Sequence, residues 1–374
     1  MKNILGLINL HEDGELLKEI ARERPLAAIP FGGRFRIIDF ILSNMVNSGI
    51  QAVGIVLKQQ SRSLMDHLRS GKEWDLARKR DGLFILPPPD HIHYTNSIYK
   101  GDLEHFYNQA DFIRGSRQDY VLIACSHIIY NFNFYDAYQS HLENRADITV
   151  LYKEVQPCPG KSFSQATLVS VGADGWVTDM EVKVGKIAGG TIGLEAFIMS
   201  KELLLQIIDD CIAIGEFDLT KEGIIKNIRR YKVRGFPFRG YMAKINSIPD
   251  YYQASMELLS QDVCRELFNE SGPIYTKVKD EAPVNYREQA IVSNSMVANG
   301  CIIEGRVENS LLFRGVRVHK GAIIKNSIIM QQGTVGANAT LENVICDKYV
   351  TISAGKRLLG DKNYVMVIEK RMVI

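Results

Sequence analysis

The first two thirds of the chain alternate two patterns of hydrophobic positions. Nearly continuous apolar runs of strand length occur at residues 4–10, 52–57, 120–124 and 148–152. Between them, apolar residues recur every three or four positions, as on one face of a helix, over residues 36–48, 61–69, 104–113 and 201–212. Apolar strands separated by amphipathic helices are typical of a parallel sheet covered on both faces. Ligands of such sheets bind at the carboxyl ends of the strands.

From about residue 285 the pattern changes to a repeat. The pair Asn-Ser begins at Asn294, Asn309 and Asn326, and Asn343 precedes a valine, so the spacings are 15, 17 and 17 residues. Apolar residues inside the repeats recur every six positions, which predicts a three-sided β-solenoid of about 18 residues per turn. Asn and Gly suit its tight corners, where left-handed backbone is needed. A β-sandwich is the alternative, but its strands alternate every two residues without a fixed long period.

These patterns predict two domains. Residues 1–245 are expected to form an α/β domain, and residues 285–374 a parallel β-helix. Residues 246–284 are expected to form a helical linker, in which the helical piece at 251–268 ends near Gly272 and Pro273.

Composition mainly excludes classes of function. The 45 Lys and Arg residues nearly balance the 43 Asp and Glu residues, so neither nucleic acid nor an anionic membrane is an expected partner. No apolar run approaches the ~20 residues that span a bilayer, and no secretory signal is expected at the N-terminus. The six cysteines form no C-x-x-C pair, which favours buried free thiols over a zinc site or disulfides. We expect a cytoplasmic protein.

A specific match begins at residues 30–50, PFGGRFRIIDFILSNMVNSGI. This stretch resembles the bacterial glucose-1-phosphate adenylyltransferase family, also called ADP-glucose pyrophosphorylase. The similarity continues in order through QSRSLMDHL, LPPP, GIIKNIRRYKVRGFPFRGYM and CIIEGRVENSLLFRGVRVHKGAIIKNSIIM. The resemblance implies a Rossmann-like nucleotidyltransferase domain followed by a left-handed β-helix. It also implies a reaction that joins glucose 1-phosphate to ATP, giving ADP-glucose and pyrophosphate.

The phosphate loop of this family is not preserved. Its pattern G-G-x-G-x-R matches HEDGEL, in which Gly14 is kept and Leu16 stands for the arginine. A glycine lets the backbone approach a phosphate closely. The acidic residues Glu12, Asp13 and Glu15 would instead repel a polyphosphate. A different, tolerant phosphate loop is the alternative to a dismantled one.

The family's remaining charged groups are also altered. Its R-A-K-P keeps Arg24 but has Leu26 for the lysine. Its two metal-binding aspartates, in G-D-H-I-Y and G-Y-W-x-D-x-G-T, match Ser126 and Lys244. Octahedral Mg²⁺ is usually coordinated by at least one carboxylate, and the positive charge of a lysine repels the ion. The resemblance therefore implies that no metal is bound. An alternative is that the Lys244 ammonium replaces the metal and binds phosphate directly.

Other positions keep the family's residues. Lys183 matches the lysine that would pair with the sugar phosphate, and Gly101 and Gly193 match two family glycines. The resemblance implies a vestigial sugar-phosphate or nucleotide pocket at these residues together with Gly14 and Arg24, although a solvated Lys183 is the alternative. Arg36 matches a basic position at which the family's small phosphorylated effectors bind between the domains. The alternative is that Arg36 only anchors its helix.

Within the family, a preserved scaffold with an altered site resembles the non-catalytic regulatory subunits. The resemblance implies a hetero-oligomer, expected to be a heterotetramer, with a catalytic glucose-1-phosphate adenylyltransferase subunit in glycogen biosynthesis. A weakly active adenylyltransferase remains the main alternative. Acyl transfer with His319 as the base is a third, because some left-handed β-helices host that chemistry. An exposed corner histidine is the simpler interpretation, since fold alone says little about function.

Overall fold

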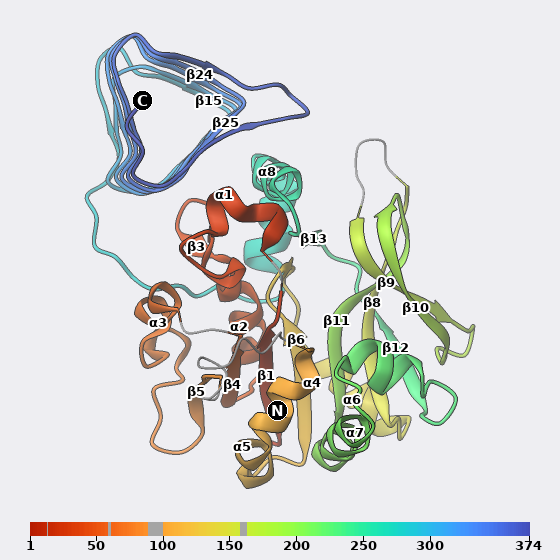
Figure 1. Cartoon of the computed structure of the whole chain (residues 1–374). Coiled ribbons are helices and arrows are strands. Elements are labelled where there is room, and N and C mark those ends of the chain that lie inside the picture. The colour runs from red at the N-terminus through yellow and green to blue at the C-terminus, as the bar shows by residue number, and fades with distance from the viewer. Residues whose placement is uncertain (13, 59–60, 89–99, 158–162) are drawn as a thin grey trace.

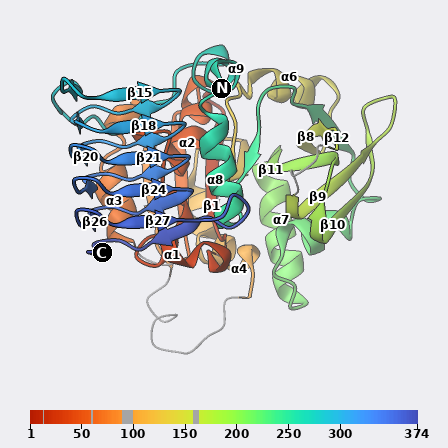
Figure 2. The ribbon, with the colours of Figure 1, turned by 90° about the horizontal axis from the view of Figure 1, so that it is seen from above.

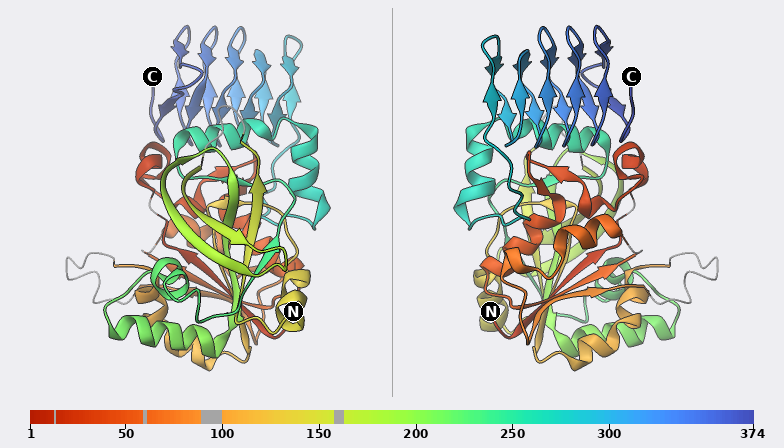
Figure 3. Two further views of the ribbon diagram at one scale, coloured as in Figure 1. Left: turned by 90° about the vertical axis from the view of Figure 1, so that its right-hand side faces the viewer. Right: turned by 90° about the vertical axis from the view of Figure 1, so that its left-hand side faces the viewer.

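The computed structural model describes residues 1–12, 14–58, 61–88, 100–157 and 163–374. An α/β domain is followed by a triangular solenoid that stands over one end of it (Figure 1). The helices α1 (Lys18–Ala21) and α8 (Ile248–Glu257) lie between the sheet and the solenoid (Figures 1 and 3). Asp13 of the phosphate-loop match, Pro89 of LPPP and Cys158 lie outside the described residues. The predicted class, an α/β domain followed by a left-handed β-helix, is confirmed.

The sheet of the first domain is mixed. Its strands, together with four short flanking strands, are β1 (Ile4–Leu10), β2 (Pro30–Phe31), β3 (Phe35–Arg36), β4 (Ala52–Leu57), β5 (Gly82–Leu86), β6 (Tyr120–Cys125), β7 (Ile128–Ile129), β8 (Ile148–Val155), β9 (Phe163–Val171), β10 (Val177–Ile187), β11 (Gly190–Ser200), β12 (Val233–Pro237) and β13 (Ala243–Lys244). Within the described residues, seven strands follow the order β10-β9-β11-β6-β1-β4-β5, and β8 pairs with both β11 and β12. Strands β6, β1, β4 and β5 are parallel, whereas β11 is antiparallel to β6 and β8.

The four apolar runs predicted as strands are confirmed as β1, β4, β6 and β8. The prediction of a mostly parallel sheet with helices on both faces describes β6, β1, β4 and β5, while β9, β10 and β11 add antiparallel pairs that the apolar pattern did not reveal. One face of β10 is exposed along most of its length, so this strand has no continuous apolar run. Such a strand gives a much weaker hydrophobic signal than a central parallel strand.

The helices cover both faces of this sheet. They are α1, α2 (Ile37–Asn47), α3 (Arg62–Leu68), α4 (Asp102–Asn108), α5 (Ala110–Gly115), α6 (Tyr135–Glu143), α7 (Lys201–Ala213), α8 and α9 (Gln261–Arg265), with helical turns at η1 (Glu15–Leu17), η2 (Leu26–Ala28), η3 (Lys72–Trp74), η5 (Leu219–Ile225) and η6 (Glu266–Glu270). The predicted helix at 104–113 is two helices that meet at Gln109. The predicted helical piece at 251–268 is likewise divided among α8, α9 and η6.

The alternation of β1 shows how the two faces are filled. Ile4 and Ile8 pack in the apolar cluster that contains α2, while Leu5 and Leu7 pack in the cluster that contains α7. Successive side chains of a strand point to opposite faces, so a fully apolar strand feeds two cores. Both faces of β1 are therefore buried, which leaves its carboxyl end as the place for polar groups.

The solenoid consists of three stacked, five-stranded parallel sheets, whose coils are seen in Figure 2. Its strands are β14 (Asn285–Tyr286), β15 (Ile291–Ser293), β16 (Met296–Val297), β17 (Ile302–Ile303), β18 (Arg306–Glu308), β19 (Leu311–Leu312), β20 (Arg317–Val318), β21 (Ile323–Lys325), β22 (Ile328–Ile329), β23 (Thr334–Val335), β24 (Thr340–Glu342), β25 (Val344–Cys346), β26 (Thr351–Ile352), β27 (Arg357–Leu359) and β28 (Met366–Ile368). Ile302 pairs with Arg317, and Arg317 with Thr334, so a coil is slightly shorter than the predicted turn.

The Asn-Ser repeat has a direct structural role at one corner. The four asparagines all adopt a positive φ of 40° to 53°; they are Asn294, Asn309, Asn326 and Asn343. This confirms the left-handed backbone expected there. The hydroxyls of Ser295, Ser310 and Ser327 each accept a backbone N–H from the next coil at 3.1 Å. Each repeat therefore turns the chain with its asparagine and joins neighbouring coils with its serine. His319 is exposed at another corner, as the simpler interpretation expected.

A third apolar cluster and a buried ion pair attach the solenoid to the first domain. The sheet that contains β19, β22 and β25 contributes Leu311, Ile328 and Ile345 to a cluster that also contains Tyr251 of α8. Arg24 forms an ion pair with Asp347, and both side chains are at most 5% exposed. The contact between the domains therefore combines a buried apolar face with a buried ion pair.

The cysteines fit the expectation of free thiols. Cys125, Cys211, Cys301 and Cys346 are buried and free, whereas Cys264 is free but only half-buried. Among the described residues, no helix has both the length and the apolarity that crossing a bilayer requires.

The Arg24–Asp347 pair gives a prediction about stability. Replacing Asp347→Asn leaves a buried guanidinium without its counter-charge, so the free energy of unfolding should fall by about 3 kcal/mol. The matched control is Glu369→Gln, which removes the exposed partner of Arg22 and should cost less than about 1 kcal/mol. Urea unfolding of the three proteins measures both values. Equal losses would contradict a special role for the buried pair.

Candidate functional site

Polar residues gather where β1 and β6 end side by side. The two strands are parallel and pair Asn9 with Cys125, so the residues that follow them, Glu12 and Ser126, come to the same edge of the sheet. This is the edge at which ligands of α/β sheets bind. The Ser126 position, matched to a metal-binding aspartate, therefore lies at the expected place.

Glu12 and Ser126 are directly bonded to each other. The Ser126 backbone N–H and its hydroxyl both donate to Glu12 Oε1, at 2.8 and 2.9 Å. His127 Nδ1 lies 3.4 Å from the same oxygen. The Glu12 side chain is only 6% exposed, so its charge is held by these groups and not by water. The polar groups that follow β6 thus already have Glu12 as their hydrogen-bond partner.

A second carboxylate, that of Glu195, joins the cluster from the neighbouring strand, with 18% of its side chain exposed. The pairing of β11 with β8 shifts register between Gly193 and Phe197, and Glu195 there has a φ of +49°. Such an irregularity turns a side chain away from its regular direction. Glu195 Oε2 lies 3.7 Å from His127 Nε2, so the imidazole stands between two carboxylates.

Lys244 completes the cluster. The short strand β13 pairs antiparallel with β7, with Lys244 opposite Ile128, next to His127. Its ammonium group donates to Glu195 Oε1 at 2.7 Å and to the Gln165 carbonyl at 2.8 Å. The side chain is 3% exposed. Two of its three donors are thus used inside the protein, which disfavours the alternative that Lys244 binds a phosphate directly.

We call these five residues the charged cluster: Glu12, Ser126, His127, Glu195 and Lys244. Compensation of charge within it lowers the pKa values of its two carboxyl groups. Burial alone would raise the pKa of Glu12, but the hydrogen bond and charge of His127 outweigh it and hold that pKa at about 2. Burial alone would also raise the pKa of Glu195, but the charge of the Lys244 ammonium outweighs this effect. The pKa of Glu195 is therefore about 2 as well. Both carboxylates therefore stay ionised at neutral pH.

These residues do not suit magnesium. Cys125, His127 and Glu195 bring potential ligand atoms within 4.8 Å of one another, but a thiol and an imidazole are softer ligands than Mg²⁺ prefers. Burial and the nearby carboxylates hold the pKa of Cys125 well above its ordinary value, so its thiol stays protonated. The Lys244 ammonium already contacts the one carboxylate of this set. A divalent cation would have to displace that ammonium.

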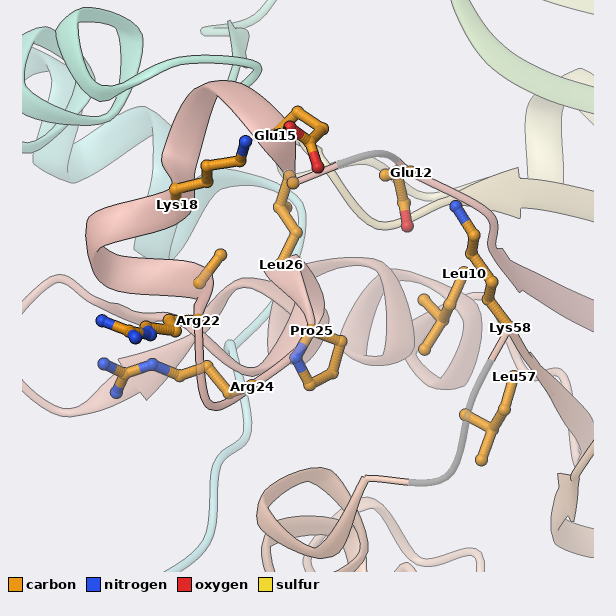
Figure 4. Close-up of a pocket in the computed structure, with 12 residues that line it drawn as sticks. Leu10, Glu12, Glu15, Lys18, Arg22, Arg24, Pro25, Leu26, Leu57 and Lys58 are labelled. Atoms are coloured by element: carbon orange, nitrogen blue, oxygen red, sulfur yellow. Dashed lines mark ion pairs between the residues drawn. The ribbon is translucent and has the colours of Figure 1, made fainter. Parts of the chain in front are cut away.

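A cavity of ≈ 340 Å³ adjoins the cluster, and Gly14, Arg24 and Leu26 line it together with Glu12 (Figure 4). The structure thus brings together the residues predicted from the phosphate-loop match, while Leu16 is exposed to solvent. Glu12 is bonded to Ser126, and Glu15 forms an ion pair with Lys18. The expected repulsion of a polyphosphate is therefore smaller than three free carboxylates would give.

The one basic residue kept from R-A-K-P has a different use. Arg24 Nε donates to the Ile20 carbonyl at 2.8 Å, and its guanidinium pairs with Asp347 of the solenoid. Figure 4 shows Arg22 and Arg24 extending to one side, away from Glu12 and Lys58. Leu26 is buried and brings no charge to the cavity wall. Arg24 is thus committed to the contact between the domains.

Gly101 has a packing reason to be glycine. It precedes α4, and an added Cβ would lie 2.2 Å from the Phe217 carbonyl oxygen. The next residue, Asp102, accepts the Leu219 backbone N–H at 2.7 Å, and burial raises its pKa to about 6. This Gly101 environment is closed by the protein itself, so the match with a family glycine gives no evidence of a ligand.

Lys183 and Gly193 pair with residues outside the charged cluster. Lys183 is on β10, its side chain is 45% exposed, and its ammonium group pairs with Glu181 at 2.7 Å. Gly193 is paired with Tyr152 of β8. These positions agree with the alternative of a solvated lysine more than with a sugar-phosphate pocket around Lys183.

Arg36 lies in a second cavity, of ≈ 360 Å³, between the α/β domain and the solenoid. Its guanidinium donates to the Ser63 carbonyl at 2.6 Å, while its backbone N–H, and not its side chain, bonds Asp39 of α2. Eight basic residues line this interdomain cavity; they are Arg34, Arg36, Lys277, Lys279, Arg314, Lys348, Lys370 and Arg371. Among the described residues, Asp66 is the one carboxylate in the lining.

The cations of the interdomain cavity are poorly compensated. Burial, together with the nearby guanidinium groups of Arg36 and Arg24, lowers the pKa of Lys348 to about 7. Burial also lowers the pKa of Arg36 to about 10. In the described part of the chain, no carboxylate forms an ion pair with Lys348, Lys279 or Arg314. An anion would relieve this mutual repulsion.

Sequence reasoning missed Glu195 and most of the interdomain cavity. Glu195 carried one usable signal, because it is a single charged residue within the apolar strand β11. The cavity had no local signal, since Lys277 and Lys279 come from the linker and Lys348 and Lys370 from distant coils. Only the packing of the solenoid onto the first domain brings these charges together.

Comparisons with known proteins agree with the two-domain structure. Residues 13–178 match the nucleotidyl transferase family, and residues 280–364 match the GlmU-like, C-terminal hexapeptide family. The chain is 37% identical over 370 residues to glycogen biosynthesis protein GlgD of Bacillus subtilis (strain 168), which covers 99% of this chain and 96% of that protein. It is 39% identical over 322 residues to GlgD of Geobacillus stearothermophilus, a match that covers 86% of this chain and 82% of that protein. It is also 33% identical over 368 residues to glucose-1-phosphate adenylyltransferase of Thermomicrobium roseum, covering 97% and 85%.

The charged cluster predicts how stability depends on Lys244 and on pH. Replacing Lys244→Met leaves Glu195 buried without its counter-charge, so the free energy of unfolding near neutral pH should fall by about 3 kcal/mol. The pKa of Glu195 is depressed to about 2, so its ionised form stabilises the fold above its ordinary pKa of 4.5 and loses this effect as the pH falls toward 2. The deficit of the variant should therefore shrink in acid.

Urea unfolding at about pH 7 and about pH 3 measures this deficit. The control is Lys183→Met, which removes an exposed partner of Glu181 and should cost less than about 1 kcal/mol at either pH. A Lys244→Met deficit that is the same at both pH values would contradict the pairing with an ionised Glu195.

Proposed function

Because this chain belongs to the bacterial glucose-1-phosphate adenylyltransferase family, we propose that it is a regulatory subunit of that enzyme, impaired in catalysis by itself. It would act in glycogen biosynthesis, in the cytoplasm, by modulating a catalytic partner subunit. The observation that carries the proposal is the buried cluster at the carboxyl end of β6. There Ser126 and Lys244 replace the family's carboxylates and are bonded to Glu12 and Glu195.

The chemistry of nucleotidyl transfer explains why this cluster argues against catalysis. Transfer between phosphates depends on positioning and on cations that neutralise the developing charge. Here the Lys244 ammonium pairs with Glu195, and the Ser126 backbone N–H donates to Glu12, so these groups serve the protein's own carboxylates. A substrate phosphate would therefore meet groups that are already paired, because the two carboxylates of the cluster, Glu12 and Glu195, are bonded to Ser126 and Lys244.

The preserved scaffold suggests what such a chain would do. A subunit can change the conformational equilibrium of its neighbour through shared contacts without doing chemistry. Both the solenoid core and the mixed sheet are closely packed, with Ile324 and Leu341 of the solenoid fully buried. We propose a heterotetramer with catalytic glucose-1-phosphate adenylyltransferase subunits. No nucleic acid and no membrane enter this proposal.

The interdomain cavity is the proposed site of an effector. Its eight cations and single lining carboxylate favour a small phosphorylated metabolite, and Arg36 would contact the phosphate. The cavity lies between the two domains, so an anion there would bear on their relative positions. This gives the subunit a means to pass the effector's presence to its partner, with a coupling of typical size about 1–3 kcal/mol.

A weakly active adenylyltransferase is the second candidate. It is favoured by the 33% identity to the Thermomicrobium roseum enzyme over 97% of this chain. The charged cluster weighs against it, because an active site for this reaction must leave its cations available to the phosphates. The two candidates differ in what the chain does when it is alone.

The test is ADP-glucose synthesis by the purified chain, alone and mixed with the catalytic subunit of the same organism. We expect no turnover alone, and a changed maximal rate or effector dependence in the mixture. Magnesium-dependent turnover by the chain alone would establish the second candidate. No effect in either setting would contradict the regulatory proposal.

A double variant separates the metal positions from the rest of the site. Ser126→Asp with Lys244→Asp restores both family carboxylates, yet we expect it to stay inactive, because Glu12 would then face a new carboxylate and Leu16 and Leu26 remain uncharged. The measurement is magnesium-dependent ADP-glucose formation, with a catalytic relative as the positive control. Measurable turnover would show that the loop at residues 11–16 is not disabling by itself.

The proposed effector site predicts pH-dependent anion binding. Lys348 has a pKa of about 7 and gains charge as the pH falls through that value, so it attracts an anion more strongly in mild acid. Sulfate, which keeps its charge over this range, should bind about tenfold more tightly at about pH 6 than at about pH 8. Calorimetric titration at constant ionic strength measures the affinities. Lys348→Met should remove the pH dependence, and an unchanged profile in that variant would contradict the assignment.

A further inference from the structure

Three consecutive residues tie the segment after α1 to the last coils of the solenoid. Arg22 pairs with Glu369 at 2.9 Å, Glu23 pairs with Lys370, and Arg24 pairs with Asp347. The charges on the two sides are complementary at each step. The first domain thus contacts the solenoid through alternating ion pairs in which only the third, with Arg24, is buried.

Of the Glu23–Lys370 pair, only Lys370 lines the interdomain cavity. Lys370 lines the cavity with seven other cations, whereas Glu23 does not line it and reaches Lys370 from outside. The Glu23 side chain is half exposed, and the hydrogen bond from Lys370 and the charge of Arg371 lower its pKa. Glu23 therefore supplies negative charge to the rim of a cavity that has almost none inside.

The three pairs differ in how easily they separate. Exposed ion pairs contribute about 0–1 kcal/mol and exchange readily with other ions. A buried pair such as Arg24–Asp347 is costly to break. The Glu23–Lys370 contact can therefore open while Arg24 and the apolar cluster keep the domains together.

We propose that Glu23 is an internal competitor for the anion of the interdomain cavity, and that Lys370 moves from Glu23 to the anion when the cavity is filled. This inference rests on the proposed effector site and adds the residue that sets its affinity. Release of Glu23 loosens the segment that also carries Arg22 and Arg24, both of which line the cavity beside the charged cluster. The two cavities are linked in this way through three adjacent residues.

The experiment compares sulfate binding by the full chain with that of Glu23→Gln, by calorimetric titration at constant ionic strength. Removal of the competing carboxylate should tighten sulfate binding about threefold, as expected for loss of one exposed ion pair. The matched control is Glu19→Gln, which removes an exposed carboxylate four residues earlier on α1 and should leave the affinity unchanged. Lys370→Met should weaken binding, and in that background Glu23→Gln should have no further effect.

A second readout follows the segment itself. Sulfate should increase deuterium uptake at residues 18–24 in the unaltered chain, because Arg22 and Arg24 donate their backbone N–H groups to Lys18 and Ala21 within the same segment. In Glu23→Gln the uptake should already be high without sulfate. A structural role of Glu23 alone would raise the uptake without changing the affinity for sulfate.

The outcomes separate the inference from the proposal on which it rests. Sulfate binding that is equal in the unaltered chain and in Glu23→Gln would overturn the competition and leave the effector site standing. Equal tightening in Glu23→Gln and Glu19→Gln would also overturn it, because only net charge would then matter. Failure of both the unaltered chain and Glu23→Gln to bind sulfate would overturn the effector site and the inference together.

Discussion

The need to compensate buried charge governs the carboxyl edge of the sheet. Glu12, Glu195 and Lys244 are each largely removed from water, and an unpaired charge in such a place is costly. The structure meets this requirement by pairing them through Ser126 and His127. The irregularity at Glu195 and the short β13–β7 pairing both serve to bring these groups into contact. A substrate or metal would have to break a compensated set.

The cavity beside the charged cluster and the interdomain cavity differ in how their charges are compensated. In the cavity beside the charged cluster, the carboxylates of Glu12 and Glu15 have partners within the protein. In the interdomain cavity, Lys348, Lys279 and Arg314 are crowded together, with burial and neighbouring cations lowering their pKa values. An excess of charge of one sign in a partly buried cavity is a common feature of ligand sites. Binding at this chain is therefore expected between the domains, away from the edge where the family's chemistry takes place.

Sequence predicted the parts of the fold that depend on local pattern. The strands β1, β4, β6 and β8 follow from continuous apolar runs, and the corners at Asn294 and Asn309 follow from a repeated residue with a backbone preference. The antiparallel strands β9 to β11 were missed, because an exposed face dilutes the apolar pattern. The positions of Ser126 and Lys244 could be named from the resemblance. Their partners could not, since Glu195 reaches them only through a register shift that no local pattern encodes.

Arg24 illustrates why a retained residue does not carry its role with it. In the family match it is the arginine kept from R-A-K-P, beside a lysine that has become Leu26. In the structure its Nε donates to the Ile20 carbonyl and its guanidinium pairs with Asp347. Because an arginine can bind a phosphate or a carboxylate with the same donors, the loss of one partner leaves it available to the other. The same side chain thus strengthens the contact between the domains.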